Sequence, residues 1–275
     1  MRLGIIGKPQ CGKTTVFNAA SGKEVAVGDF SKAVHRAAIK VPDIRLDNLA
    51  KLVSPQKITY AEIEFLDAPG FTGKGKASTG FEISQELQLM DAIILVINHF
   101  EPDAAPEKDI QDIIDEMILA DQVMLEKIIK NKSKKMKLTG DKSAAWELNL
   151  LKKCQINLDN EIPLIDVDFT ADEKKTLRGF NYLTLKPLLI VLNIGEDDIS
   201  ESENILRKFN DFATPDKREI ASLCGKIEME LVNLNIEDRK IFMADLGISM
   251  PAVEQVIRKS YSLLGLISFF TIGKP

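Results

Sequence analysis

The sequence predicts an α/β fold, in which helices cover a mostly parallel β-sheet and an α-helical hairpin is inserted as an arm. Two observations predict the sheet: a strand–loop–helix unit opens the chain, and apolar runs alternate with helical patterns on both sides of a central region. The third observation is that this central region is a long charged stretch with helical spacing, which predicts the arm. With 275 residues and 45% hydrophobic composition, the chain can bury a substantial core.

The expected strands are short apolar or alternating segments, and they span residues 2–6, 37–41, 61–66, 92–98, 187–192 and 219–223. Helical spacing predicts helices that begin at residue 15 and others near residues 44–53, 82–90, 226–234, 237–246 and 250–264. Residues 22–38 show no clear period and predict a loop that runs into the second strand. The alternation of strands and helices is typical of a parallel sheet.

The arm is predicted by apolar residues at helical spacing, namely Ile110, Ile113, Ile114, Met117, Ala120, Met124 and Ile128. Thr139-Gly140-Asp141 interrupts this pattern, and a second helix is expected from Lys142 to Leu158. Two long helices around a short turn form an antiparallel hairpin. Thr170, followed by two carboxylates, predicts the start of a further helix, because acidic groups are stabilised near a helix N-terminus.

Between the first strand and the first helix lies Gly7-Lys8-Pro9-Gln10-Cys11-Gly12-Lys13-Thr14, the G-x-x-x-x-G-K-[ST] pattern of a phosphate-binding loop, or P-loop. A loop in this position directs successive backbone N–H groups at a polyphosphate. The strand before it and the helix after it favour this interpretation over a chance match. The expected phosphate-binding residues are Lys8, Pro9, Gln10, Cys11, Gly12, Lys13, Thr14 and Thr15.

Lys13 is expected to place its ammonium group on the β- and γ-phosphates, and Thr14 to give its hydroxyl group to Mg²⁺. Asp67-Ala68-Pro69-Gly70 is a D-x-x-G pattern at the end of a predicted strand. By itself this pattern is most often a turn, but its position after a P-loop favours Asp67 as a metal ligand and the Gly70 N–H as a γ-phosphate contact. Lys13 and Gly70 are therefore the candidate catalytic residues, and Ser31 is a weaker candidate for a second metal-binding hydroxyl.

Phe71 follows the D-x-x-G pattern at the place where many small GTPases carry a glutamine that orients the attacking water. A phenylalanine cannot orient water. One interpretation is a protein that binds nucleotide without hydrolysing it. The other is slow hydrolysis, with water positioned by other groups or by a partner.

Asn193-Ile194-Gly195-Glu196 lies where guanine-specific proteins carry N-K-x-D, whose aspartate accepts hydrogen bonds from guanine N1–H and the N2 amine. Glu196 is one methylene longer, and Ile194 replaces the lysine that lies along the base. Adenine lacks both guanine donors and can be met by backbone groups. These residue types favour ATP over GTP, while a charged loop without base contact is the alternative.

Composition excludes several classes of protein. The net charge of −5 does not suggest a nucleic-acid-binding protein, although the local run Lys130-Asn131-Lys132-Ser133-Lys134-Lys135-Met136-Lys137 could contact RNA phosphates or simply be a solvated helix end. The longest strongly apolar run, residues 92–97, is too short to cross a membrane. Three widely spaced cysteines predict reduced thiols in a cytoplasmic protein.

Together these residues resemble the YchF subfamily of Obg-related P-loop NTPases. Beyond the P-loop, the similar segments are Pro42-Asp43-Ile44-Arg45-Leu46-Asp47, Leu119-Ala120-Asp121, Phe180 to Pro187 and Cys224-Gly225-Lys226-Ile227-Glu228. The last of these resembles the family's base loop. The P-loop sequence K-P-Q-C and the segment from Phe30 to Arg36 depart from the family pattern.

The resemblance implies a Ras-like nucleotide-binding domain over residues 1–103 and 185–268, an inserted helical domain over residues 104–184, and the start of a TGS domain at residues 269–275 that the chain does not complete. It implies that Cys224, Gly225 and Lys226 join Asn193, Ile194 and Glu196 around the base, and that Ser31 corresponds to the switch threonine. It also implies binding of ATP at least as well as GTP, and ribosome association in translation or stress regulation, with the helical arm as a possible ribosomal RNA contact.

The leading hypothesis is a Mg²⁺-dependent nucleoside-triphosphate-hydrolysing switch that prefers ATP. The alternative is a regulatory module that binds ATP or GTP, hydrolyses it negligibly and docks on a ribosomal partner. A nucleotide kinase is disfavoured, because the chain has a D-x-x-G loop and no arginine-rich lid segment. The sequence gives no information on the oligomeric state.

Overall fold

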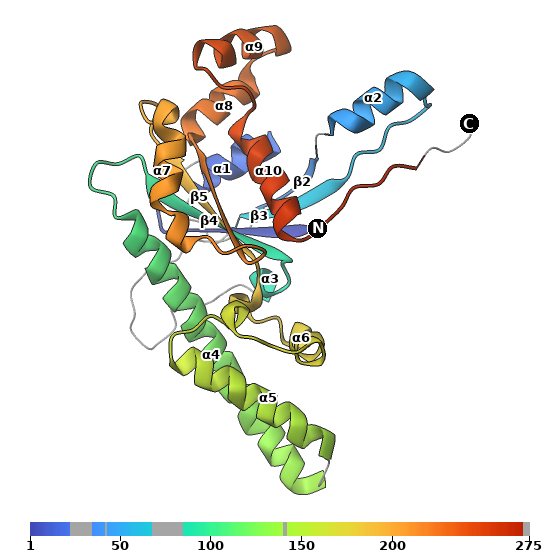
Figure 1. Cartoon of the computed structure of the whole chain (residues 1–275), viewed down its shortest axis with the longest axis vertical. Helices are drawn as coiled ribbons and strands as arrows, with labels where there is room; N and C mark the ends of the chain where they lie inside the picture. The colour runs from blue at the N-terminus through green and yellow to red at the C-terminus, as the bar shows by residue number, and fades with distance from the viewer. Residues whose placement is uncertain (23–34, 42, 68–84, 140–141, 272–275) are drawn as a thin grey trace. The chain divides into compact units, whose positions relative to one another are not determined.

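The structure is a computed structural model that describes residues 1–22, 35–41, 43–67, 85–139 and 142–271 (Figure 1). The chain divides into two compact units. The first comprises Met1–Phe71, Met90–Pro106 and Pro187–Pro275, and the second comprises Thr72–Leu89 and Glu107–Lys186.

The first unit is built on a six-stranded sheet with the order β2-β3-β1-β4-β5-β6. The strands are β1 (Arg2–Ile6), β2 (His35–Lys40), β3 (Glu62–Asp67), β4 (Ala92–His99), β5 (Leu188–Ile194) and β6 (Arg218–Leu223). All neighbours are parallel except β2, which runs antiparallel to β3 at the edge of the sheet. The prediction of a mostly parallel sheet is confirmed, and residues 35 and 36, expected in a loop, belong to β2 instead because they pair with β3.

The core lies between this sheet and two helices, α1 (Lys13–Ser21) and α10 (Ala252–Leu263). Alternate residues of each strand point to one face because the side-chain period of a strand is two. Leu3, Phe65 and Ile94 lie on this face together with Phe17 of α1 and Val256 of α10. Every residue of β5 and the first six residues of β4 are buried, as expected for central parallel strands covered on both faces.

The remaining helices of the first unit are α2 (Ile44–Val53), α7 (Ser202–Lys208), α8 (Gly225–Asn233) and α9 (Ile236–Asp245). Local capping explains where two of them begin. The Asp43 carboxylate accepts a hydrogen bond from the Arg45 N–H at the start of α2, and the Asn235 side chain accepts from two N–H groups at the start of α9. Side-chain caps of this kind satisfy backbone donors that the helix itself leaves free.

The second unit contains the predicted hairpin, formed by α4 (Pro106–Thr139) and α5 (Lys142–Asp159), which lie side by side in Figure 1. Buried residues from both helices form the seam, including Ile113, Met117 and Leu125 of α4 and Leu151 and Leu158 of α5. Polar contacts at both ends hold the two helices together. Gln122 donates to the Leu158 carbonyl at 3.2 Å, and Lys132 pairs with Glu147 at 2.6 Å.

The helix expected near residues 82–90 is α3 (Gln85–Gln88) in the described part of the chain. It lies in the second unit, where the Lys186 ammonium donates to the Gln88 carbonyl at 2.8 Å. Three short 3-10 turns and α6 (Ala171–Leu177) complete this unit.

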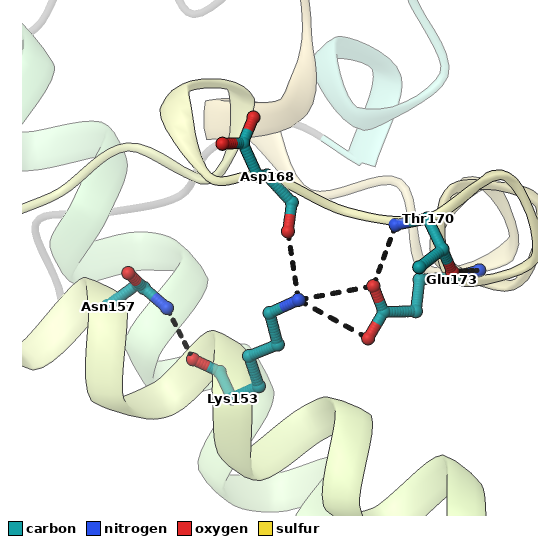
Figure 2. Close-up of polar contacts among 5 residues, drawn as sticks. All are labelled: Lys153, Asn157, Asp168, Thr170 and Glu173. Atoms are coloured by element: carbon teal, nitrogen blue, oxygen red, sulfur yellow. Dashed lines mark hydrogen bonds and ion pairs between the residues drawn. The ribbon is translucent and has the colours of Figure 1, made fainter.

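The start of α6 is held by a polar cluster around Lys153 of α5, shown in Figure 2. Thr170 and Glu173 form a reciprocal capping box, which confirms the predicted helix start at Thr170. The Lys153 ammonium donates to the Asp168 carbonyl at 2.9 Å and to Glu173 at 3.1 Å, and it lies 4.7 Å from the centre of the Phe169 ring. The hydrogen bond from the Thr170 N–H, together with Lys153, keeps the pKa of Glu173 below its usual value. Lys153 thereby ties α5 to the segment that leads into α6.

A second polar tie is buried. The Asp121 side chain on α4 is 2% exposed and accepts hydrogen bonds from the Leu183 N–H, the Thr184 N–H and the Thr184 hydroxyl at 2.7–2.8 Å. Burial raises the pKa of this carboxyl group from 3.8 to about 6, while the hydrogen bonds from Thr184 and Leu183 and the charge of Lys186 act in the opposite direction. Asp121 therefore fixes the turn Leu183–Leu185, which precedes β5, against α4.

We predict that Asp121 makes the protein more stable at mildly acidic pH than at neutral pH. Because the pKa of Asp121 is raised in the folded state, the folded protein binds the proton more readily than the unfolded chain, so this contribution to stability grows as the pH falls through about 6. The wild-type free energy of unfolding, relative to that of Asp121→Asn, should increase by about 2 kcal/mol between about pH 7.5 and about pH 4.5. Urea unfolding across this range measures the difference.

The exposed Asp172→Asn substitution on α6 controls for the removal of one carboxylate from the same unit. A wild-type-minus-Asp121→Asn difference that stays constant across the pH range would contradict a raised pKa at Asp121.

Candidate nucleotide-binding site

The predicted site residues meet at the carboxyl ends of the parallel strands. The P-loop follows β1, Asp67 ends β3, Asn193 lies near the end of β5, and Cys224 follows β6. The chain leaves β1 towards β3 and leaves β4 towards β5, so β1 and β4 form a switch point of the sheet. Ligands of open α/β sheets bind outside the strand ends at such a point.

Two glycines of the P-loop are required by close contacts within the protein. A Cβ atom at Gly7 would lie 2.5 Å from the Val96 carbonyl oxygen of β4. Gly12 has a φ of 87°, in the left-handed region, and a Cβ there would lie 2.1 Å from the Asn193 amide nitrogen. Gln10 also has a positive φ, of 65°. The loop therefore lies directly against β4 and β5 in a conformation that side chains at positions 7 and 12 would prevent.

The P-loop leads into the N-terminus of α1, whose first turn has no acidic residue and no side-chain cap. The free N–H groups and the partial positive charge at such a helix end favour an anion. Around this end, Pro9 and Gln10 are exposed, and Lys8, Thr14 and Thr15 are partly exposed. The chain thus offers backbone donors and cationic side chains at the same place.

Lys13 and Thr14 converge on Asp67. The Thr14 hydroxyl donates to Asp67 Oδ2 at 3.1 Å, and Lys13 Nζ lies 3.9 Å from Asp67 Oδ1. Burial raises the pKa of Asp67, while Lys13, Thr14 and His35 act to lower it. The buried Asp67 carboxylate therefore lies beside the Thr14 hydroxyl group and the Lys13 ammonium group.

The residues present fit a magnesium ion. Asp67 Oδ1 is buried and has no hydrogen-bond partner among the described residues. A buried carboxylate oxygen without a partner is costly, and Mg²⁺ prefers oxygen ligands such as this carboxylate and the Thr14 hydroxyl. Mg²⁺ commonly uses one or two protein ligands and completes its coordination with phosphate oxygens and water. Thr14 and Asp67 are thus the pair that could hold the ion.

Cys11 has a structural role in the loop. Its side chain is 2% exposed, and burial raises the pKa of its thiol to about 11, so the thiol stays protonated at neutral pH. Cys154 and Cys224 are also buried, and all three cysteines are free thiols.

Asn193 connects the P-loop to the predicted base loop. Its Nδ2 donates to the Cys11 carbonyl at 3.0 Å, and its Oδ1 accepts from the Gly225 N–H at 3.0 Å. A carbonyl can only accept and an N–H can only donate, so these partners fix the orientation of the amide. Asn193 is 5% exposed, and its two hydrogen bonds hold the P-loop and the predicted base loop against the end of β5.

The other predicted base-binding residues lie close to Asn193. The Ile194 side chain is 3% exposed, which leaves its backbone as the part available to a ligand. Cys224 is buried at the start of α8, and its side chain makes no capping hydrogen bond. Glu196 and Lys226 form an ion pair with each other, and this pair raises the pKa of Lys226.

Three predicted residues of the switch region, Ser31, Gly70 and Phe71, lie outside the described residues. Their expected roles stay predictions.

One supporting residue had no role assigned from the sequence. Glu228 of α8 is 3% exposed and accepts hydrogen bonds from the Ala252 N–H at 2.7 Å and the Val253 N–H at 3.3 Å. It caps α10, whose own N-cap, Pro251, provides no side-chain acceptor. The signal in the sequence was a carboxylate four residues after Cys224, but its partners are more than twenty residues away. Glu228 thereby links α8, which follows the predicted base loop, to α10, which covers the sheet.

The fold and the site together define a P-loop NTPase: a strand, a glycine-bearing loop and a helix, with a buried aspartate from a neighbouring strand facing the loop's lysine and threonine.

Comparisons with known proteins agree with this class. Residues 2–142 match the family described as 50S ribosome-binding GTPase. The chain is 35% identical to the ribosome-binding ATPase YchF of Bacillus subtilis over 288 residues, covering 98% of this chain and 78% of that protein. It is 33% identical to the ribosome-binding ATPase YchF of Escherichia coli O157:H7, covering 99% of this chain and 78% of that protein. The chain belongs to the YchF family of P-loop NTPases.

Solved structures support the fold. The YchF GTPase of Schizosaccharomyces pombe superposes with a TM-score of 0.80 at 22% identity, covering 99% of this chain and 78% of that one. A GTP-binding protein of Pyrococcus horikoshii superposes with a TM-score of 0.53 at 17% identity, covering 96% of this chain and 78% of that one.

In the part of the chain that the structure describes, no helix has the length and apolar character needed to cross a membrane.

We predict that Asn193→Ala destabilises the first unit and weakens nucleotide binding. The substitution leaves the Cys11 carbonyl and the Gly225 N–H buried without their partner, and an unpaired buried group costs about 1–3 kcal/mol. We expect a loss of about 2 kcal/mol or more in the free energy of unfolding, measured by urea denaturation, and weaker binding of Mg·ATP in calorimetric titration.

Asn204→Ala is the matched control, because Asn204 is an exposed asparagine on α7 whose side chain bonds to the exposed residues Glu201 and Arg207. If Asn193→Ala and Asn204→Ala had equal stability, the joining role of Asn193 would be refuted.

Proposed function

We propose that the protein is a Mg²⁺-dependent, slowly hydrolysing nucleoside-triphosphate switch that prefers ATP to GTP. The observation that carries this proposal is the convergence of Lys13 and Thr14 on the buried carboxylate of Asp67, whose Oδ1 has no hydrogen-bond partner among the described residues. An ammonium group, a hydroxyl group and a carboxylate suit phosphate and metal binding. Lys13 and Thr14 begin a helix whose first turn has no acidic residue, and Asp67 faces them from the end of β3.

In this proposal the P-loop amides and the Lys13 ammonium bind the β- and γ-phosphates and stabilise the negative charge that develops on the transferred group. Thr14 and Asp67 hold the metal, with Ser31 as a further hydroxyl ligand, and Mg²⁺ when bound neutralises phosphate charge. The Gly70 N–H contacts the γ-phosphate. Lys13, now 3.9 Å from Asp67, would turn its charge from this carboxylate to the phosphates.

The base would lie between the Asn193–Glu196 segment and the Cys224–Lys226 segment. The preference for ATP is supported by the buried Ile194 side chain and by Glu196, which is paired with Lys226. The names of relatives point in both directions, since the bacterial relatives are called ATPases and the fission-yeast structure is called a GTPase.

We predict that Lys13→Ala lowers Mg²⁺-dependent ATP hydrolysis about a hundredfold or more, because removal of a preorganised charge at the transferred group typically costs this much. Phosphate release, measured with ATP and with GTP, gives the turnover. Calorimetric titration of the wild type should show tighter binding of Mg·ATP than of Mg·GTP.

Lys208→Ala, on the exposed end of α7, controls for the loss of one lysine, and melting curves verify that the variants remain folded. Wild-type turnover no greater than that of Lys13→Ala, combined with tight ATP binding, would replace the enzyme by a nucleotide-binding regulatory module.

We further propose that the protein acts in the cytoplasm on the ribosome, in translation or stress regulation, and that the helical arm supplies an RNA contact. The relatives are named for ribosome binding. In the described part of the arm, Lys127, Lys130 and Lys134 are exposed on α4. Exposed lysines of this kind bind phosphates and release counterions.

We predict that the triple substitution of Lys127, Lys130 and Lys134 by glutamate weakens cosedimentation with purified ribosomes and reduces the dependence of binding on salt, because three phosphate contacts are lost. A charge-matched control replaces Lys152, Lys174 and Lys175, which are exposed elsewhere in the same unit. If the α4 variant and the control variant bound ribosomes equally well, the three α4 lysines would have no specific role, and the proposed contact through α4 would be refuted.

A further inference from the structure

At the predicted base-binding segments, two groups that could bind a nucleotide base are already bonded within the chain. The Glu196 carboxylate pairs with the Lys226 ammonium. The Gly225 N–H donates to Asn193 Oδ1 at 3.0 Å. All four residues belong to the first unit: Asn193 lies near the end of β5, Glu196 follows β5, and Gly225 and Lys226 begin α8, which follows the neighbouring strand β6.

Guanine and adenine carry hydrogen-bond donors and acceptors at different positions of the edge that a protein can read. Guanine presents N1–H and an N2 amine as donors and O6 as an acceptor, whereas adenine presents an N6 amine as a donor and N1 as an acceptor. An ionised carboxylate can only accept hydrogen bonds. Guanine offers it two adjacent donors, whereas adenine offers one donor beside the acceptor N1, so a free glutamate would favour guanine over adenine. A free backbone N–H can donate to guanine O6 or to adenine N1, so by itself it does not discriminate between the two bases.

The Glu196–Lys226 pair is placed where it can be altered without disturbing the core. The Lys226 and Glu196 side chains are 71% and 43% exposed, respectively. Asn193 is 5% exposed, and its bond to Gly225 also depends on the position of the P-loop. Of the two internal bonds, the ion pair is therefore the one that a single surface substitution can release.

We propose that Lys226 is a specificity-determining residue, which engages the Glu196 carboxylate and thereby weakens recognition of guanine relative to adenine. This inference rests on the proposed nucleotide-binding function and deepens it by assigning the base preference to one ion pair. The size of the effect is limited, because exposed ion pairs are weak: their measured strengths correspond to a factor of about two to five in an equilibrium constant.

The test is calorimetric titration of the full chain with Mg·ATP and with Mg·GTP, expressed as the ratio of the two dissociation constants, Kd(GTP)/Kd(ATP). The ratio cancels any change in attraction for the triphosphate, which is the same in both nucleotides. Lys226→Met should lower the ratio about two- to fivefold, mainly through tighter GTP binding. Lys226→Arg, which can keep the ion pair, should leave the ratio close to that of the wild type.

Two further variants isolate the carboxylate. In the double variant Lys226→Met with Glu196→Gln, the gain in GTP binding should disappear, because the freed carboxylate is no longer present. Lys208→Met removes an exposed lysine on α7 and should leave the ratio unchanged.

The outcomes separate this inference from the proposed function. A wild type that binds neither nucleotide would refute the proposed function and the role of Lys226 with it. A wild type that binds nucleotide, with a ratio that Lys226→Met does not lower, would refute only the role of Lys226. Weaker ATP binding with unchanged GTP binding would show that Lys226 contacts adenine directly, and this outcome also overturns the proposal.

Discussion

The nucleotide-binding unit depends on the side-chain amide of Asn193. It bonds to the Cys11 carbonyl, 182 positions earlier in the chain, and to the Gly225 N–H, 32 positions later. One buried amide thus sets the distance between the loop that precedes α1 and the loop that precedes α8. Because the group is buried and both of its partners are backbone atoms, neither loop can move alone without leaving an unpaired polar group in the interior. The P-loop and the predicted base loop are therefore positioned by contacts within the protein itself.

The same constraint explains the glycines of the P-loop. Gly7 lies against the Val96 carbonyl and Gly12 against the Asn193 amide, so the loop is pressed onto the ends of two strands. This packing aims the N-terminus of α1 at the space beside Asp67, where Lys13 and Thr14 already lie. Asp67 Oδ1, which has no hydrogen-bond partner among the described residues, is a cost to the folded protein that a bound cation would relieve. A cation bound at this carboxylate would thus couple stability to ligand binding.

The arm uses a different combination of forces. Its two long helices pack through an apolar seam, which explains why apolar residues recur at helical spacing in their sequences. The seam does not specify where the segments after α5 attach. Two polar ties do so. Asp121 holds the Leu183–Leu185 turn through buried hydrogen bonds, and Lys153 holds the start of α6 (Figure 2). The Asp121 tie is buried, and buried polar groups are costly when only partly satisfied, so its complete set of hydrogen bonds positions the Leu183–Leu185 turn closely. The two ties together attach the turn and α6 to the helices of the arm at defined positions.

The sequence by itself determined the class of fold, the hairpin, the capped start of α6 and the P-loop, because periodic apolar spacing, capping residues and a contiguous motif are local signals. It also predicted that Thr14, in the P-loop pattern, and Asp67, in the D-x-x-G pattern, lie close together, because both were expected to bind the same metal ion. Only the tertiary structure decided that Gly12 makes room for Asn193, that Glu228 caps α10, and that Lys226 pairs with Glu196. Each of these contacts joins residues that are distant in the chain, and a pair of single residues with no fixed spacing leaves no periodic pattern from which their contact could be inferred.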